Sequence, residues 1–348
     1  MSTLTKTLMM TLTLTLAGAC DVEDADFGDG EVALRPGGGG FSGISLNTDF
    51  FTDGVGFHGM SVAEIDTKGN LHKGVDLYKV CLMGGEVCIF PGKDELYVKQ
   101  GEIHAIKGGG MSFSGTDFAN SEWYVQLDSD GDDKIDSYGV MVIQEAYIGM
   151  TATGIKYWNY MWLNDTSRAK GLITQKWEGK GGESIPVCKI DVDTGSLGSV
   201  ALGNVTIDNS EFTHGDIDHR DDTLYIACHS GAVGKAPHVW NYVHHDLGDK
   251  AYETAVRVIR ADYCNDGTSF TQEGQQLLTD DDKAYNSAYN PAEDTELLAS
   301  WDKGIVCVNP KGLRLAKIED VEEVCEVKYC DGSDTWWGAG LDLMTQAL

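Results

Sequence analysis

Alternating hydrophobic and polar positions dominate the first half of the chain, where short β-forming runs are separated by Gly or Asp turns. Such alternation indicates strands that bury one face and expose the other. The spacing predicts a sandwich or barrel in an N-terminal β-rich domain over residues 41–150, built from the runs FHGMSVAEI, DLYKVCL, ELYVKQGEI, SEWYVQLD and SYGVMVIQEAYI.

The same pattern continues beyond residue 155, and one helical segment then interrupts it. The runs IKYWNYMWL, GLITQKW, VCKIDV and TLYIACHS keep β character. We predict a helix over about 249–264, because apolar positions there recur at helical spacing and an Asn-Asp-Gly stop follows at 265–267. The predicted fold class is therefore mainly β, with sandwich- or barrel-like sheets, one clear helix and disulfides.

Composition favours a globular, turn-rich protein and excludes one class of partner. The 348 residues include 43 glycines and 6 prolines, and two compact units or one elaborated β-rich unit are expected at this length. Asp and Glu total 55 against 26 Lys and Arg, giving a net charge of -29. Because this charge repels phosphate backbones, we expect no nucleic-acid partner. The acidic residues are dispersed, which favours solvation of an exported surface.

The N-terminus has the features of an export signal over residues 1–20. A charged Lys6 precedes an apolar segment too short to span a bilayer, and small residues at 17–19 precede Cys20. The small residues suit signal peptidase I, and they also resemble a bacterial lipobox, with Ala17 where Leu is usual. In a lipoprotein Cys20 is acylated. Residues 21–40 are acidic and end in four glycines, which predicts a flexible tether.

Cysteine arithmetic favours acylation of Cys20. The chain has 9 cysteines, and an odd thiol is a liability in an oxidising compartment. If Cys20 takes lipid, the remaining eight cysteines can form four disulfides. We therefore expect the lipid bilayer to be a partner through acylated Cys20. The alternative is plain secretion with a free or intermolecular Cys20.

The end of the predicted helix carries a family resemblance. The segment AVRVIRADYCNDGTSFTQEG resembles the signature of the ADYC domain, a family of Gram-negative bacterial exported proteins and lipoproteins, and its signature residues are Ala261, Asp262, Tyr263 and Cys264. TLYIACHSGAVGKA around Cys228, LASWDKGIVCV around Cys307 and GISLN at 43–47 also resemble family segments. Where the family pattern has two further cysteines, this chain has Ala236 and Ala255, as expected of a missing disulfide.

The resemblance covers roughly 155–320 and leaves 321–348 as a C-terminal extension. It implies a cell-envelope location, as an outer-membrane or cell-surface lipoprotein, and a related fold. It implies no biochemical activity, because none is established for the family.

Eight cysteines remain for disulfides after Cys20. Cys81 and Cys88 flank LMGGEV, whose glycines suit a hairpin turn, so a local bridge is expected there. For the others we assign pairs, although the connectivities are many and the sequence leaves the choice open. The assigned pairs are Cys188 with Cys228, Cys264 with Cys307, and Cys325 with Cys330.

Two clusters of polar residues are candidates for chemistry. The segment LDSDGDDKIDS places alternating carboxylates in a Gly-containing turn, which suits a hard cation such as calcium, and its candidate ligands are Asp128, Asp130, Asp132 and Asp136. It departs from an EF-hand at its sixth and twelfth positions, Asp133 and Gly139, and an acidic hairpin loop is the alternative. The second cluster consists of histidines in THGDIDHRDD and HVWNYVHHD, namely His214, His219, His238, His244 and His245.

We interpret the chain as an exported envelope protein that acts as a binding or structural surface module. No nucleophile, base and orienting group lie at recognisable spacing, which favours a non-enzyme. The alternative is a secreted hydrolase or metal-dependent enzyme, with its site around His214, His219, His244 and His245. Clustered histidines in a cleft would favour that enzyme. An exposed Tyr/Trp face would favour a binding module, and the candidate rings are Tyr157, Trp158, Tyr160, Trp162, Trp336 and Trp337.

Overall fold

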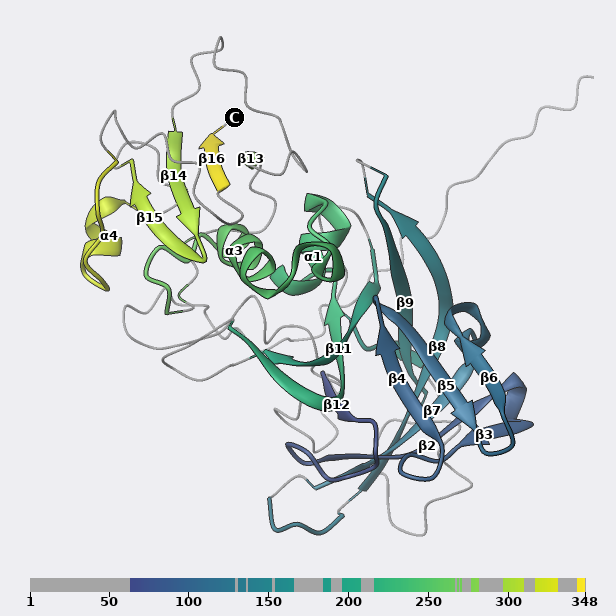
Figure 1. The fold of residues 1–348 in the computed structure, drawn as a ribbon. Helices are drawn as coiled ribbons and strands as arrows, with labels where there is room; N and C mark the ends of the chain where they lie inside the picture. The colour runs from purple at the N-terminus through teal and green to yellow at the C-terminus, as the bar shows by residue number, and fades with distance from the viewer. Residues whose placement is uncertain are drawn as a thin grey trace, which may run out of the picture. The chain divides into compact units, whose positions relative to one another are not determined.

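A computed structural model provides the structure of the chain (Figure 1). It describes residues 63–128, 131–135, 137–151, 154–165, 184–188, 196–207, 216–266, 268, 270, 277–281, 297–309, 317–330 and 343–347. The expected signal peptide 1–20, Cys20 and the tether 21–40 lie outside these residues. Within the described part of the chain, no helix is long and apolar enough to cross a membrane.

A nine-stranded antiparallel sheet is the central element of the described residues. Its strand order is β1-β12-β11-β9-β8-β7-β2-β3, and β10 pairs with β9. The strands are β1 (Glu64–Asp66), β2 (Val75–Leu82), β3 (Val87–Ile89), β7 (Ser121–Leu127), β8 (Ser137–Met150), β9 (Lys156–Asp165), β10 (Ser184–Pro186), β11 (Gly198–Ile207) and β12 (Ile217–Cys228). Because β8 pairs with β9, the sheet joins strands from the expected domains 41–150 and 155–320.

Alternation decides which side chains of this sheet are buried. In β7 every second residue is buried, as a strand covered on one face requires. Trp123 of β7 meets Trp162 of β9 edge to face, with ring centroids 5.0 Å apart. In β11 and β12 both sets of alternate residues are buried, which indicates that both faces of the sheet are covered there.

A second sheet covers one of these two faces. It has the order β4-β5-β6, with β4 (Glu95–Lys99), β5 (Glu102–Lys107) and β6 (Met111–Ser114). Val98 of β4 shares one hydrophobic core with Ala201 of β11, whereas Val200 and Leu202 of β11 belong to another core with the helices. Short 3-10 turns lie at Met83–Gly85 and Gly115–Phe118.

Helices cover the opposite face of β11 and β12. They are α1 (Ala232–Trp240), α2 (His244–Leu247) and α3 (Asp249–Arg260), and α4 (Ile318–Glu322) follows later in the chain. Helix α3 confirms the helix expected over about 249–264 and ends earlier, because Ala261 adopts a left-handed conformation with φ 53°. Helix α1 was not expected, because the sequence pattern indicated one clear helix only, over about 249–264.

Helix α1 contains Pro237, which explains why the sequence pattern hides it. Proline lacks an N–H and leaves a carbonyl one turn earlier without its helical donor. The carbonyl of Val233 instead accepts a hydrogen bond from the buried hydroxyl of Tyr252 on α3. A hydroxyl from another helix therefore replaces the N–H donor that proline lacks.

A four-stranded antiparallel sheet contains the C-terminal strands of the described part. Its order is β13-β16-β14-β15, with β13 (Leu277–Asp281), β14 (Leu297–Asp302), β15 (Gly304–Val308) and β16 (Leu343–Ala347). Helix α3 contacts both β14 and β16. The expected extension 321–348 thus supplies a strand to the same sheet as β14 and β15.

The mainly β fold class is confirmed, with open sheets in the described residues, four helices and four disulfides. The bridges Cys81–Cys88 and Cys188–Cys228 are paired as expected. The other two assigned pairs are wrong, because the structure joins Cys264 to Cys325 and Cys307 to Cys330.

The physical reason for the different pairing lies in the path of the chain after α4. Cys325 comes after α4 in the chain, and its backbone N–H donates to the carbonyl of Val321 in α4. Its disulfide holds it against Cys264, after the end of α3. The chain then runs beside β15, and the N–H of Cys330 donates to the carbonyl of Val308, next to Cys307. Cys325 and Cys330 are close in sequence but are held at different elements.

Candidate functional site

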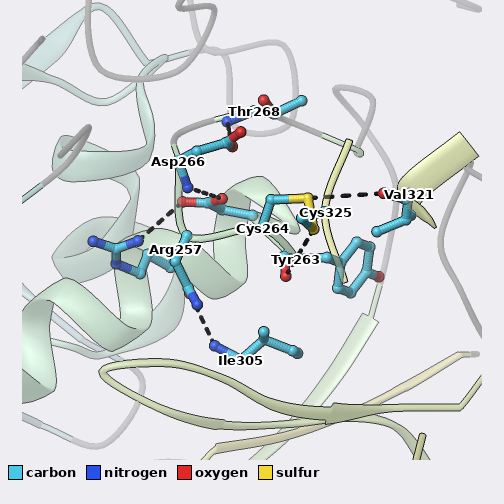
Figure 2. Close-up of a disulfide and its surroundings, with 10 residues drawn as sticks. Arg257, Tyr263, Cys264, Asp266, Thr268, Ile305, Val321 and Cys325 are labelled. Carbon is cyan, nitrogen blue, oxygen red and sulfur yellow. Dashed lines mark hydrogen bonds and ion pairs between the residues drawn. A yellow bond between two sulfur atoms is a disulfide. The ribbon is translucent and has the colours of Figure 1, made fainter. Parts of the chain in front are cut away.

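The signature residues follow directly after the C-terminal end of α3. Figure 2 shows two of them, Tyr263 and Cys264. Ala261 is buried and makes the left-handed turn that ends the helix. This turn brings the Asp262 N–H to the carbonyl of Arg257. The chain thus leaves the helix with its next three side chains directed into the surrounding structure.

Asp262 is a buried carboxylate with strong partners. Its side chain is fully buried, its Oδ2 lies 3.2 Å from Nη1 of Arg257, and its Oδ1 accepts the backbone N–H of Asp266. Arg257 also pairs with Asp216. Burial lowers the pKa of neighbouring Arg260 to about 10, so that guanidinium remains charged at neutral pH beside Asp262. A carboxylate held in this way stabilises a corner of the fold and is inaccessible to a substrate.

Tyr263 and Cys264 connect the same corner to the C-terminal segments. The Tyr263 ring stacks on Trp301 of β14 with centroids 5.5 Å apart, and both rings are buried. Cys264 forms its disulfide with Cys325, after α4. The four signature residues therefore join α3, β14 and the α4 segment, and we interpret them as structural.

The acidic turn after β7 is held by one of its own carboxylates. Asp128 is buried and accepts backbone N–H groups from Gly131, Asp132 and Asp133, at 2.8, 3.3 and 2.8 Å. Asp132 pairs with Lys134, and the candidate ligands Asp130 and Asp136 lie outside the described residues. Across the described part of the chain, no group of three or more His, Cys, Asp or Glu side chains is arranged to hold a metal ion.

The structure brings two of the four candidate histidines together. Nε2 of His219 lies 2.6 Å from Oδ2 of Asp249, and Nε2 of His244 lies 2.8 Å from Oδ1 of the same carboxylate. Burial alone would raise the pKa of Asp249, but the hydrogen bonds from His244 and His219 outweigh it and hold this pKa below its usual range. His245 contacts Asp246 instead, and His214 lies outside the described residues.

His244 and His245 line a cleft that opens where β9 and β11 separate. The two strands pair only through Gly198 with Met161 and Ser199 with Tyr160. Beyond these pairs the cleft has a volume of about 200 Å³. It is lined by the turn between β4 and β5, by β9, by residues 200–203 of β11, and by α1, α2 and α3.

The lining of this cleft carries no fixed charge. Among the described residues that form it there is no Asp, Glu, Lys or Arg, although the chain has a net charge of -29. Burial lowers the pKa of His245, and the neighbouring His244 lowers it further against the opposing effect of Asp246. Burial also raises the pKa of Tyr157 to about 12, so its phenol is neutral. The cleft therefore presents rings, aliphatic groups and uncharged hydrogen-bonding groups.

A buried polar network supports Tyr157 from behind. Its hydroxyl lies 2.8 Å from Nδ1 of His238, and His238 stacks on His229 with centroids 3.9 Å apart. Nδ1 of His229 lies 2.8 Å from Oγ of Ser196. Ser196 and His229 resemble a nucleophile with its base. However, burial lowers the pKa of His229, and the neighbouring His238 lowers it further, to about 2. His229 therefore does not accept a proton from Ser196 at neutral pH, and we interpret the network as support.

Most residues of this cleft carry no recognisable signal in the sequence. Tyr157 and Trp158 were singled out as aromatic residues, and Tyr160 and Trp162 of the same run are fully buried. Gln100, Val200 and Leu202 carried no signal, because nothing in the periodicity of two strands shows where their pairing stops. Asp249 was a helix start without an assigned role, and an acidic residue in the first turn of a helix was its one visible signal.

These features define a mainly β protein, stapled by disulfides, that has an uncharged cleft between two separated strands. The family model of the ADYC domain matches residues 115–314, which is more than half of the chain. The chain belongs to the ADYC domain family. No curated protein and no solved structure matches it.

Proposed function

We propose that this chain is an exported, lipid-anchored protein of the bacterial cell envelope that binds an uncharged ligand in the cleft between β9 and β11. The observation that carries the binding role is the cleft lining, where aromatic and aliphatic side chains surround a few uncharged polar groups. Such a combination is typical of small ligand sites, in which apolar contacts give affinity and polar groups fix orientation.

Export and anchoring are supported by the cysteines and by the N-terminal pattern. The eight cysteines that follow Cys20 form four disulfides, which are stable in an oxidising compartment. Of the nine cysteines, Cys20 is the one that these four bridges do not use. It follows the apolar segment and the small residues 17–19, which is the position of the acylated cysteine in a lipoprotein. Acyl chains at one residue give a stable anchor when more than one is present.

Expression in a Gram-negative host tests the anchor. Intact mass from the membrane fraction is expected to show a diacyl or triacyl adduct, and Cys20→Ser is expected to move the chain to a soluble exported fraction. Thiol alkylation should appear only after reduction. A wild-type chain without lipid, found in the soluble fraction, would contradict the proposed anchoring.

Nuclear magnetic resonance tests the cleft as a binding site. A library of uncharged fragments is added to the disulfide-bonded chain, and shifts are expected at Tyr157, Leu202 and Tyr252. Replacing His245, which lines the cleft, with Trp adds a bulky ring there and should abolish these shifts, whereas Asp246→Trp on the same helix should leave them. Shifts spread over the surface, or unaffected by His245→Trp, would refute the binding role.

A second candidate function is hydrolysis, and one observation favours it. Asp249 holds Nε2 of His244 at 2.8 Å, and a carboxylate placed in this way orients a histidine that acts as a general base on water. The lining supplies no Ser, Thr, Cys or carboxylate among the described residues, so binding is favoured. If the chain hydrolyses a panel of neutral esters or glycosides, and His244→Gln loses this activity while keeping ligand binding, the enzyme is the correct assignment.

A further inference from the structure

The cleft separates two strands whose ladder stops abruptly. β9 and β11 are antiparallel, and Gly198 with Met161 and Ser199 with Tyr160 are their paired residues. If the register continued, Ala201 would pair with Trp158 and Leu202 with Tyr157. These residues are not paired and instead line the cleft.

The backbone groups of the separated strands point into the cleft. On β9, the Trp162 carbonyl accepts the N–H of Val187, so the backbone N–H and C=O of Trp162 point toward β10 and β11. The backbone groups of every second residue from Trp162, including Trp158, point to the same side. On β11, the Gly198 carbonyl accepts the N–H of His229 on the β12 side. The backbone N–H and C=O of Ala201 therefore point toward β9, opposite those of Trp158.

Strand edges of this kind are templates for a further strand. In the described residues β11 pairs only with β12 and β9, and β9 pairs only with β8, β10 and β11. Within the described part of the chain, the N–H and C=O groups of Trp158 and Ala201 thus have no ladder partner across the cleft. Unpaired backbone groups favour a segment that supplies the missing hydrogen bonds.

We propose that the ligand of the cleft is an extended polypeptide segment with uncharged side chains, which adds as a strand between β9 and β11. This inference rests on the proposed binding role and specifies its ligand. Strand addition obtains affinity from main-chain hydrogen bonds and specificity from pockets for alternate side chains.

The dimensions of the cleft limit the inserted segment to a few residues. Residues 200–203 line it on β11, and at a rise of about 3.3 Å per residue they span roughly 10 Å. An inserted strand of three or four residues matches that length. Longer peptides would bind through such a core, with their ends outside the cleft.

The two walls of the cleft select side chains. Alternate residues of an inserted strand would point toward opposite faces of the sheet. One face is covered by Val98 and Gln100, and the other by Pro237, Val243 and Tyr252. Because the described residues of these walls carry no fixed charge, a charged side chain would lose hydration without gaining a partner, which selects apolar or hydroxyl side chains.

An array of blocked octapeptides made from Val, Ile, Thr and Ser tests the proposal on the disulfide-bonded chain. Binding peptides are expected, and peptides of the same length carrying Lys or Glu at central positions should bind at least tenfold more weakly. N-methylation of a central backbone nitrogen should weaken binding at least fivefold, because it removes a main-chain donor and keeps the side chains. An N-methylated peptide that binds as well as its parent would overturn strand addition.

Two tryptophan variants on α2 locate the binding. His245→Trp is expected to weaken the peptides at least tenfold, and Asp246→Trp, whose position does not line the cleft, to leave them unchanged. Equal unfolding midpoints for the two variants exclude a folding defect. If neutral fragments bind in the cleft but no peptide does, the peptide inference fails and the proposed binding role stands. If neither binds there, both fail.

Discussion

The disulfide between Cys264 and Cys325 should stabilise the fold more than the bridge between Cys81 and Cys88. The two cysteines of the first bridge are 61 residues apart, and those of the second are 7 apart. Loss of chain entropy in the unfolded state gives about 4.3 kcal/mol for the long loop and about 2.4 kcal/mol for the short one. Removing the long bridge should therefore cost about 2 kcal/mol more.

Double variants to serine measure this difference without leaving an orphan thiol. Urea unfolding of Cys264→Ser with Cys325→Ser is compared with that of Cys81→Ser with Cys88→Ser, each against the wild-type chain. The first pair should show the lower free energy of unfolding and a loss of the C-terminal contacts of Tyr263. Equal losses, or a larger loss from the short bridge, would refute the assigned role of the signature corner.

Two buried residues and one partly exposed carboxylate provide three further tests of the fold. Asp262→Asn leaves Arg257 with less compensation and should lower the free energy of unfolding by about 2–4 kcal/mol, measured by urea unfolding, whereas an effect below about 1 kcal/mol would contradict the buried ion pair. Gly198→Ala places a Cβ 2.2 Å from Oδ1 of Asn159. This overpacking should lower the free energy of unfolding by about 1–3 kcal/mol, and thermal unfolding should show a lower midpoint. Asp249 has a lowered pKa, so its stabilisation is present above its unfolded value of 3.8 and is lost as the pH falls through the folded value. Asp249→Asn should therefore flatten the loss of stability as the pH falls from 3.8 through the lower folded value, and an unchanged profile would contradict this role.

The strands were predictable because burial of one face imposes alternation that the sequence records. β7 is the clearest case, with a run that alternates over its whole length. The helix α3 was equally visible, because its apolar residues recur at helical spacing. Helix α1 was hidden, since its stability depends on Tyr252, a residue of a different element, bonding to Val233.

The disulfides show a similar limit. The Cys81–Cys88 bridge joins directly paired residues of a hairpin, and a turn signal in the sequence predicts it. Cys325 and Cys330 are near neighbours in sequence, yet Cys325 bonds to Cys264 after α3 and Cys330 bonds to Cys307 in β15. Sequence distance cannot supply that information, because α4 and the segment after it determine where each cysteine lies.

The candidate site was predictable only in its histidines and in two of its aromatic residues, Tyr157 and Trp158. His219 and His244 appear in polar clusters, but it is Asp249 that joins them. The cleft itself results from the point at which two strands separate, and that point depends on the packing of β4 on one face and the helices on the other. No local pattern of residues encodes it.

Amide hydrogen exchange in the ligand-free chain tests the separated strands most directly. The backbone groups of Val200 and Leu202 point toward β12, and those of Tyr160 pair with Ser199. The amides of Val200, Leu202 and Tyr160 should therefore exchange slowly. The amides of Trp158 and Ala201 face the cleft and should exchange at least tenfold faster. If Trp158 and Ala201 are as protected as Tyr160 and Val200, the ladder continues across the cleft and the binding site proposed between β9 and β11 does not exist.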